Sequence, residues 1–341
     1  MTDVTEVEVG PPTSTRRADL DKLLLPQIAP KPLFDVRLIS SQELLELPMP
    51  PKQHLLVPWI PEKGLGLVYA PRGVGKTLFG LSIAYAVASG GVFLRWSAPR
   101  PRHVLYIDGE MPLGTMRERL AAIEKGSERK VDGDFLRFLC ADALEGEMID
   151  LGRSFARREL EPHLDGIDLI IVDNISTVVR SVAESDGDSW KPVQEWMLRQ
   201  RRASRSVLFI HHANRRGGPR GTSRREDVVD TVISLTRPAD YRSSEGARFV
   251  IEFEKARGFT GDEAVPLEAR YETVDGAARW TWKPVVDEVN ERAKDLFEQG
   301  LSVRQVEKEL GISKSAAGRL RQRWQAEANG EDEEEDQEGT A

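Results

Sequence analysis

Seven short apolar runs follow one another along the middle of the chain, and stretches with helical spacing separate most of the first five. The runs cover residues 65–69, 103–107, 136–140, 167–172, 206–211, 229–235 and 248–253. Strands that alternate with helices favour a mainly parallel sheet that is covered by helices on both faces. The last two runs lie closer together, which predicts antiparallel strands at one edge of the sheet. The pattern predicts one α/β domain over residues 36–285.

The two ends of the chain have a different pattern. Residues 1–35 are rich in Pro, Thr and charged residues without a sustained period, and we expect a flexible N-terminal segment there. Residues 331–338 are almost all acidic, so that 328–341 are expected to form a disordered acidic tail.

Short amphipathic helices are predicted over residues 287–327. Ser302 and Gln305 have the spacing of a capping box, and Gly311 provides a turn before a second, basic helix. Two short helices joined at a glycine are typical of a helix-turn-helix domain, which would present Lys314 and Arg319 to duplex DNA. The alternative is a helical hairpin that packs on the main domain or on a neighbouring molecule.

Charge is segregated along the chain, so its formal net charge of −8 conceals a basic zone. No acidic residue occurs between Glu195 and Glu226, whereas arginines recur there. They are Arg199, Arg201, Arg202, Arg205, Arg215, Arg216, Arg220, Arg224 and Arg225. A local basic zone favours a nucleic-acid partner. Arg199, Arg201 and Arg202 are expected only to solvate a helix face.

The remaining composition excludes several classes of protein. Cys140 is the single cysteine, which excludes an internal disulfide framework and a cysteine-based zinc site. No apolar run approaches the length of a membrane span, and no signal-peptide pattern is present. We therefore expect a soluble, cytoplasmic protein without a membrane partner.

A glycine-rich loop between the first apolar run and a helical pattern has the context of a phosphate-binding P-loop. Its predicted nucleotide-binding residues are Ala70, Pro71, Arg72, Gly73, Val74, Gly75, Lys76, Thr77 and Leu78. Backbone N–H groups of such a loop surround phosphate oxygens, the lysine reaches the β- and γ-phosphates, and the Thr77 hydroxyl would hold Mg²⁺. Ala70 stands where the usual pattern has its first glycine. The alternative is a glycine-rich turn that only joins a strand to a helix.

Two acidic residues at strand ends complete the predicted ATP site. Asp173 directly follows the run 167–172 and would hold Mg²⁺ beside Thr77. Glu110 follows the run 103–107, on a strand expected next to the P-loop strand, and is the predicted catalytic base for the attacking water. Asp108 is expected to play a supporting or structural role.

Two further strand ends carry polar or basic residues. His211 ends the run 206–211 and His212 follows it. His212 is the predicted γ-phosphate sensor with His211 in support. Lys255 and Arg257 end the last run, project the same way and suit an arginine finger that reaches a neighbour's nucleotide. The alternative is that they neutralise nearby carboxylates such as Glu252 or Glu254.

The order of these motifs resembles that of the RecA/DnaB-like ATPases. The closest resemblance is to the RepA-like branch, the plasmid- and phage-type hexameric helicase ATPases, over about residues 40–283. It implies a RecA-like core, ATP and Mg²⁺ as ligands, hydrolysis at subunit interfaces of a homo-oligomer, and a hexameric ring around single-stranded DNA.

The resemblance also places the basic zone. The segment 214–227 follows the sensor strand, where such proteins carry a channel loop, and Arg215, Arg216, Arg220, Arg224 and Arg225 would track phosphates there. Residues 178–190 would form the preceding channel loop, in which Trp190 could stack on a base or pack in the core. The implied function is ATP hydrolysis coupled to single-stranded DNA binding or translocation in replication. The alternative is an ATP-switched regulator or partition-type protein that binds duplex DNA through its helix-turn-helix.

Overall fold

The structure is a computed structural model that describes residues 38–49, 51–182, 187–214, 218, 227–285, 288–322 and 324–325. The chain divides into two compact units, residues 1–51 and 52–341. In the first unit, helix α2 (Ser41–Glu46) begins with a capping box. Ser40 Oγ accepts a hydrogen bond from Glu43 N at 3.1 Å, and the Glu43 carboxylate accepts one from Ser40 N at 2.9 Å. These reciprocal bonds satisfy two N–H groups that the helix itself leaves without partners.

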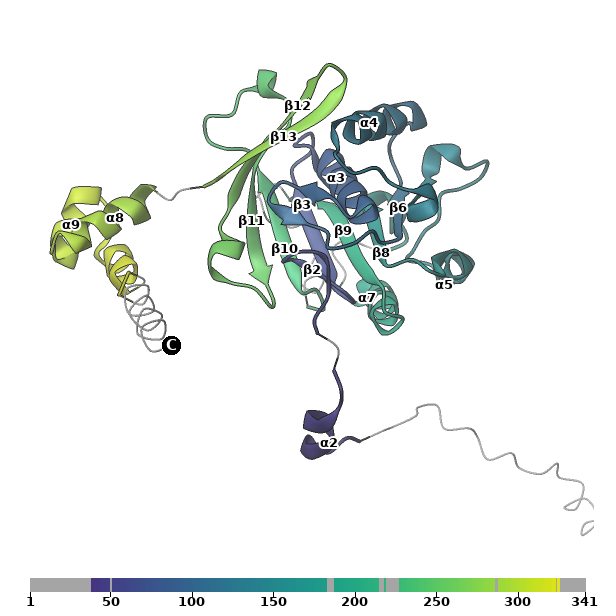
Figure 1. The fold of residues 1–341 in the computed structure, drawn as a ribbon, viewed down its shortest axis with the longest axis horizontal. Coiled ribbons are helices and arrows are strands. Elements are labelled where there is room, and N and C mark those ends of the chain that lie inside the picture. Colours follow the sequence, from purple (N-terminus) through teal and green to yellow (C-terminus); the bar gives the residue numbers. More distant parts are fainter. Residues whose placement is uncertain are drawn as a thin grey trace, which may run out of the picture. The chain divides into compact units, whose positions relative to one another are not determined.

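A nine-stranded sheet is the centre of the second unit (Figure 1). Its strands are β3 (Leu65–Ala70), β6 (Val104–Asp108), β7 (Leu136–Cys140), β8 (Leu169–Asp173), β9 (Ser206–His212), β10 (Thr231–Thr236), β11 (Arg248–Ala256), β12 (Leu267–Val274) and β13 (Ala277–Pro284). Their spatial order is β13-β12-β11-β10-β3-β9-β8-β6-β7. The six strands from β10 to β7 are parallel, and β11, β12 and β13 add antiparallel strands at one edge. The prediction of an α/β fold with a mainly parallel sheet is confirmed. Of the last two predicted runs, 248–253 is antiparallel as expected, whereas 229–235 forms β10, which is parallel to β3.

The hairpin of β12 and β13 has no counterpart among the predicted strands. Many of its residues are exposed or half-buried, so neither strand contains a continuous apolar run. Two small antiparallel pairs were also not predicted: β1 (His54–Leu56) with β2 (Ile60–Pro61), and β4 (Val92–Phe93) with β5 (Trp96–Ser97). Strands of two or three residues leave no recognisable period in a sequence.

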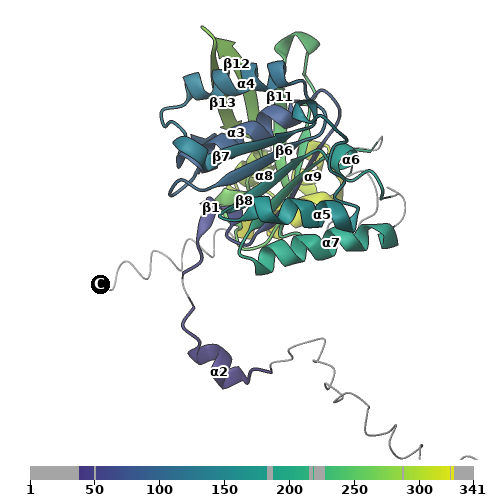
Figure 2. The same ribbon diagram turned by 90° about the vertical axis from the view of Figure 1, so that its right-hand side faces the viewer.

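Helices cover both faces of the sheet, as the alternation of strands and helices predicts. They are α3 (Lys76–Ser89), α4 (Leu113–Gly126), α5 (Ser154–Leu160), α6 (Ile175–Val178) and α7 (Gly187–Arg202). In Figure 2, α3 and α4 lie on one side of the sheet, and α5 and α7 lie on the other. Short 3₁₀ helices occupy Gly133–Phe135, Ala141–Ala143, Glu161–Leu164, Ser243–Glu245 and Gly261–Ala264.

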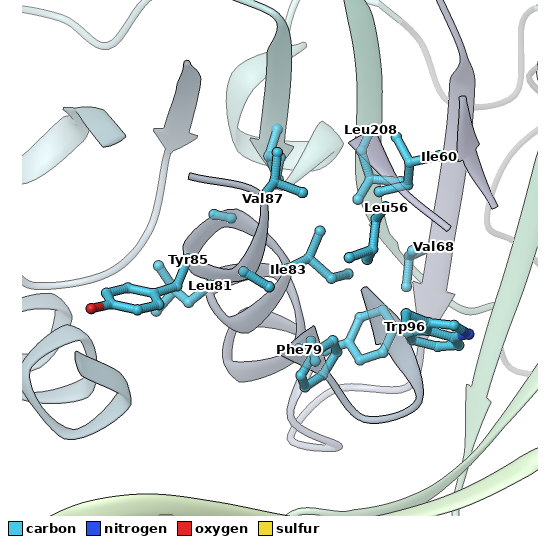
Figure 3. Packing of buried hydrophobic residues seen from close by; sticks show 14 of the residues in the cluster. Leu56, Ile60, Val68, Phe79, Leu81, Ile83, Tyr85, Val87, Trp96 and Leu208 are labelled. Carbon is cyan, nitrogen blue, oxygen red and sulfur yellow. The ribbon is translucent and has the colours of Figure 1, made fainter. Parts of the chain in front are cut away.

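Each face of the sheet has its own hydrophobic core, because successive strand residues point to opposite faces. In β3, Val68 packs into the core around α3, whereas Leu67 and Tyr69 pack into the core around α7. Figure 3 shows the first core, where Phe79 and Ile83 of α3 lie among strand residues. Helix α3 is buried on almost all sides, which explains its continuously apolar sequence.

Three helices follow the sheet. They are α8 (Glu288–Glu298), α9 (Val303–Leu310) and a helix that includes 314–322. A separate small core joins them, made of Ala293, Phe297, Val306 and Ala317. Ser302 N donates to Gln305 Oε1 at 2.9 Å, and Gly311 has a φ of 63°, so the predicted capping box and glycine turn are both present. The region 287–327 therefore contains helices, whereas a DNA-binding role for them stays a prediction.

Candidate nucleotide-binding site

The P-loop residues connect β3 to α3 at the carboxyl edge of the parallel strands. Gly73 and Gly75 have φ values of 72° and 120°, which other residues rarely adopt. Ala70 is the last residue of β3, where it pairs with His212 of β9. A strand conformation accepts a methyl group, so alanine fits the position where the usual pattern has glycine.

Lys76 is the first residue of α3 and is only 7% exposed. Its Nζ donates to the carbonyl oxygens of Pro71 at 3.0 Å and Ala70 at 3.4 Å. Burial lowers the pKa of Lys76, and the negative charges of Asp173 and Glu110 oppose this effect. The ammonium group thus lies inside the loop, where bound phosphates would meet it.

Thr77 and Asp173 are in contact, as a shared Mg²⁺ site requires. The Thr77 hydroxyl is hydrogen-bonded to the Asp173 carboxylate, which also accepts a bond of 2.8 Å from Tyr106 OH. Burial is the main cause of the raised pKa of Asp173, and these hydrogen bonds oppose it. No group of three or more His, Cys, Asp or Glu in the described part of the chain could hold a metal ion. A hydroxyl and one carboxylate fit Mg²⁺, which completes its shell with water and substrate phosphates.

Glu110 follows the predicted strand and lies at the same edge of the sheet, but this strand is not next to the P-loop strand. Its strand β6 is separated from β3 by β8 and β9, so the expected neighbouring position was wrong. The order of strands in a sequence does not fix their order in a sheet, and here two later strands lie between. Asn174 Nδ2 donates a bond of 2.7 Å to Glu110 Oε2, which holds the carboxylate beside Asp173.

Asp108 supports the turn that carries Glu110, in agreement with its expected role. Its Oδ2 accepts hydrogen bonds from Met111 N at 2.7 Å and Glu110 N at 3.2 Å. Burial raises the pKa of Asp108 to about 6, and the bond from Met111 N opposes the rise. A side chain at Gly109 would lie only 2.3 Å from Thr177 Oγ1, so this turn packs directly against α6.

His211 and His212 face different surroundings, as adjacent strand residues should. His211 is fully buried, whereas His212 is half-buried and borders a cavity of about 730 Å³ beside the P-loop. Lys76, Thr77, Glu110 and Asp173 line the same cavity. Its volume lies within the range of small-molecule sites.

Arg237 and Tyr241 are among the residues of this cavity that sequence reasoning missed. The Arg237 guanidinium lies 4.3 Å from the centre of the Tyr241 ring, and its Nη2 donates to Gly73 O at 3.3 Å. Tyr241 OH donates to Gly246 O at 2.9 Å. Arg237 could have been found from its place in the sequence, because it directly follows an apolar run that forms β10, a parallel neighbour of β3.

Arg257 and Lys255 do not line this cavity. Strand β11 is antiparallel to β10, so its end lies at the amino edge of the parallel strands, opposite the P-loop. Arg257 is 57% exposed, and its Nη1 lies 3.9 Å from Asp230 Oδ1. The carboxylate nearest to it is therefore Asp230 and not Glu252 or Glu254.

Only some of the residues predicted to bind nucleic acid are described by the structure. Arg215, Arg216, Arg220, Arg224 and Arg225 lie outside the described residues. Lys314 and Arg319 are exposed on the last helix. Trp190 is 2% exposed and packs against Phe209 with ring centres 5.9 Å apart, so that it belongs to the core.

The expectation that Arg201 only solvates a helix face was wrong. Arg201 Nη2 forms an ion pair with Asp230, and its Nε donates to Lys63 O at 3.0 Å. Arg199 and Arg202 are exposed, as expected. Arg201 differs because it lies where α7 ends beside the start of β3.

No helix in the described part of the chain is long and apolar enough to cross a membrane.

A comparison with curated proteins finds no match. A sequence profile of the AAA domain matches residues 31–218, which include the P-loop, Glu110, Asp173 and His212. Tyr241, Asp230 and Arg257 lie beyond the matched residues. The profile covers more than half of the chain, which therefore belongs to the AAA domain family of P-loop ATPases.

Proposed function

We propose that this ATPase is a ring-forming motor of the RepA-like branch, which couples ATP hydrolysis at subunit interfaces to binding of, or translocation along, single-stranded DNA. The observation that carries the proposal is the position of Arg257 at the sheet edge opposite the P-loop of its own chain. A cation there cannot reach that chain's own ATP. The Arg257 side chain is 57% exposed to solvent, so a second copy could contact it. A closed homo-oligomer would bring each Arg257 to a neighbour's site.

The residues of the cavity have defined roles in this proposal. Lys76 binds the β- and γ-phosphates, and Thr77 with Asp173 holds Mg²⁺, which neutralises phosphate charge when bound. Glu110, held by Asn174, orients the attacking water and accepts its proton. Arg257 and Lys255 of a neighbouring copy stabilise the charge that develops on the transferred phosphate.

The connection from ATP to DNA runs through β9. His212 borders the cavity, and Ala213 N donates to Ala70 O at 2.8 Å, which ties the end of β9 to the P-loop. The arginine-rich segment 214–227 follows immediately. We propose that it binds the phosphates of single-stranded DNA without sequence preference, and that His212 transmits the state of the γ-phosphate to it.

A second candidate function rests on Lys314 and Arg319, which are exposed on the helix after Gly311. Basic side chains on the second helix of a helix-turn-helix suit the major groove of a duplex. In that case ATP would switch the oligomeric state of a DNA-binding regulator.

ATP turnover of the purified protein with a single-stranded oligonucleotide, or with a matched duplex, separates the two functions. Strong stimulation by the single strand supports the motor. Turnover that ignores the single strand, together with tight duplex binding that is lost on deletion of residues 287–341, supports the regulator. Light scattering with and without ATP reports the oligomeric state in the same samples.

A further inference from the structure

Asp230 joins three parts of the ATPase domain at the amino edge of the sheet. Its Oδ2 accepts a hydrogen bond of 2.9 Å from Leu65 N, the first residue of the P-loop strand. The same carboxylate forms an ion pair with Arg201, the penultimate residue of α7. Its main chain binds Leu65 O at 2.7 Å and Arg257 N at 3.0 Å. Asp230 therefore fixes the backbone of the candidate finger to the start of β3.

The side chain of Arg257 is held much less firmly than its backbone. Its guanidinium lies 3.9 Å from Asp230 Oδ1 and is 57% exposed, and exposed ion pairs of this kind contribute little to stability. Arg201 is 31% exposed and binds the other oxygen of Asp230. If Arg257 leaves, Asp230 thus keeps one cation and one N–H donor, and no carboxylate is left without a partner.

We infer that Asp230 is a positioning residue for Arg257. Arg201 weakens the ion pair between Asp230 and Arg257, so that the Arg257 guanidinium can leave Asp230 and bind a phosphate on the adjacent copy. Asp230 keeps Arg257 near the place where it would meet the neighbour's phosphate. Because Arg201 shares the negative charge of Asp230, the ion pair with Arg257 stays weak enough to break. This inference rests on the proposed function, since Arg257 has a phosphate to reach only in an oligomer.

The inference predicts a specific pattern of turnover in the full-length protein. Arg201→Gln removes the competing cation, so Asp230 should hold Arg257 more tightly and kcat should fall about fivefold, the effect of a strengthened exposed ion pair. The KM for ATP should not change, because Arg201 lies far from the chain's own P-loop cavity. Adding Asp230→Asn to this variant should restore kcat, because the amide has no charge to hold the guanidinium, whereas the main chain of residue 230 still positions the backbone of Arg257.

Two controls separate this effect from damage to the fold. Arg202→Gln changes an exposed arginine one residue along and should leave turnover unchanged. Arg201→Lys keeps the charge and should retain wild-type kcat. A loss of about fivefold in a folded Arg201→Lys variant would overturn the inference, so it can still be refuted if Arg201→Gln fails to fold. Unchanged kcat in a folded Arg201→Gln variant, or a loss that Asp230→Asn deepens, would overturn the inference.

Mixing subunits tests the proposed function separately. Lys76→Ala subunits carry an intact finger, and Arg257→Ala subunits carry an intact P-loop, so mixed oligomers should regain turnover that neither variant has alone. If the mixed oligomers do not regain turnover, the finger in trans is refuted and the inference with it. Recovery together with wild-type kcat in Arg201→Gln refutes only the role of Asp230 and Arg201.

Discussion

Asn174 Nδ2 donates a hydrogen bond of 2.7 Å to Glu110 Oε2, and this bond joins the end of β8 to the turn after β6. Asn174 directly follows the candidate magnesium ligand Asp173 and is only 3% exposed. Its main chain also binds Thr177 at the start of α6. The candidate base Glu110 is thus oriented by Asn174, the residue that precedes α6.

Asn174→Ala should lower kcat about tenfold, because an unheld Glu110 carboxylate samples unproductive positions. Binding of a fluorescent ATP analogue should be unchanged, since the P-loop keeps its contacts. Steady-state turnover and a binding titration measure the two effects. Glu110→Gln is the matched reference and should lose nearly all turnover; wild-type kcat in Asn174→Ala would show that the hydrogen bond does not orient the base.

Tyr241 should bind the nucleobase of ATP beside Arg237. Stacking on an aromatic ring stabilises a base by roughly 1–3 kcal/mol, so that Tyr241→Ala should raise the KM for ATP about tenfold with little change in kcat. Tyr241→Phe keeps the ring and loses only the bond to Gly246 O, and it should behave as the wild type. Equal KM values in all three proteins would place the base elsewhere in the cavity.

Lys76 and Arg257 should affect different steps. Lys76→Ala should abolish both ATP binding and turnover, because the buried ammonium lies where the phosphates bind. Arg257→Ala should reduce turnover about a thousandfold and leave ATP binding intact, because the finger acts on developing charge. Titration with a fluorescent ATP analogue distinguishes the two variants. Retained turnover in Arg257→Ala would refute its role as a finger.

The sequence predicts most of this fold because buried parallel strands are continuous apolar runs, and the P-loop lies between one such run and a helix. It did not predict the separation of β6 from β3, since spatial order depends on how the crossover helices pack. Nor did it predict the ion pair of Arg201 and Asp230, which lie 29 residues apart with no local pattern to connect them. Contacts of this kind are visible only after the sheet has brought the ends of distant segments together.

Asp108 should make stability depend on pH in a defined direction. Its folded pKa of about 6 lies above the unfolded value of about 4, so the folded state binds more protons between these pH values. The free energy of unfolding contributed by this group should therefore rise by about 1 kcal/mol when the pH falls from 7 to 5. Asp108→Asn keeps an acceptor oxygen for Met111 N but cannot ionise, and it should lack this gain. Urea unfolding at both pH values, without nucleotide and with a chelator, measures the difference. The exposed Asp134→Asn serves as the control and should respond to pH like the wild type, whereas an unchanged response in Asp108→Asn would show that Asp108 is not the titrating group.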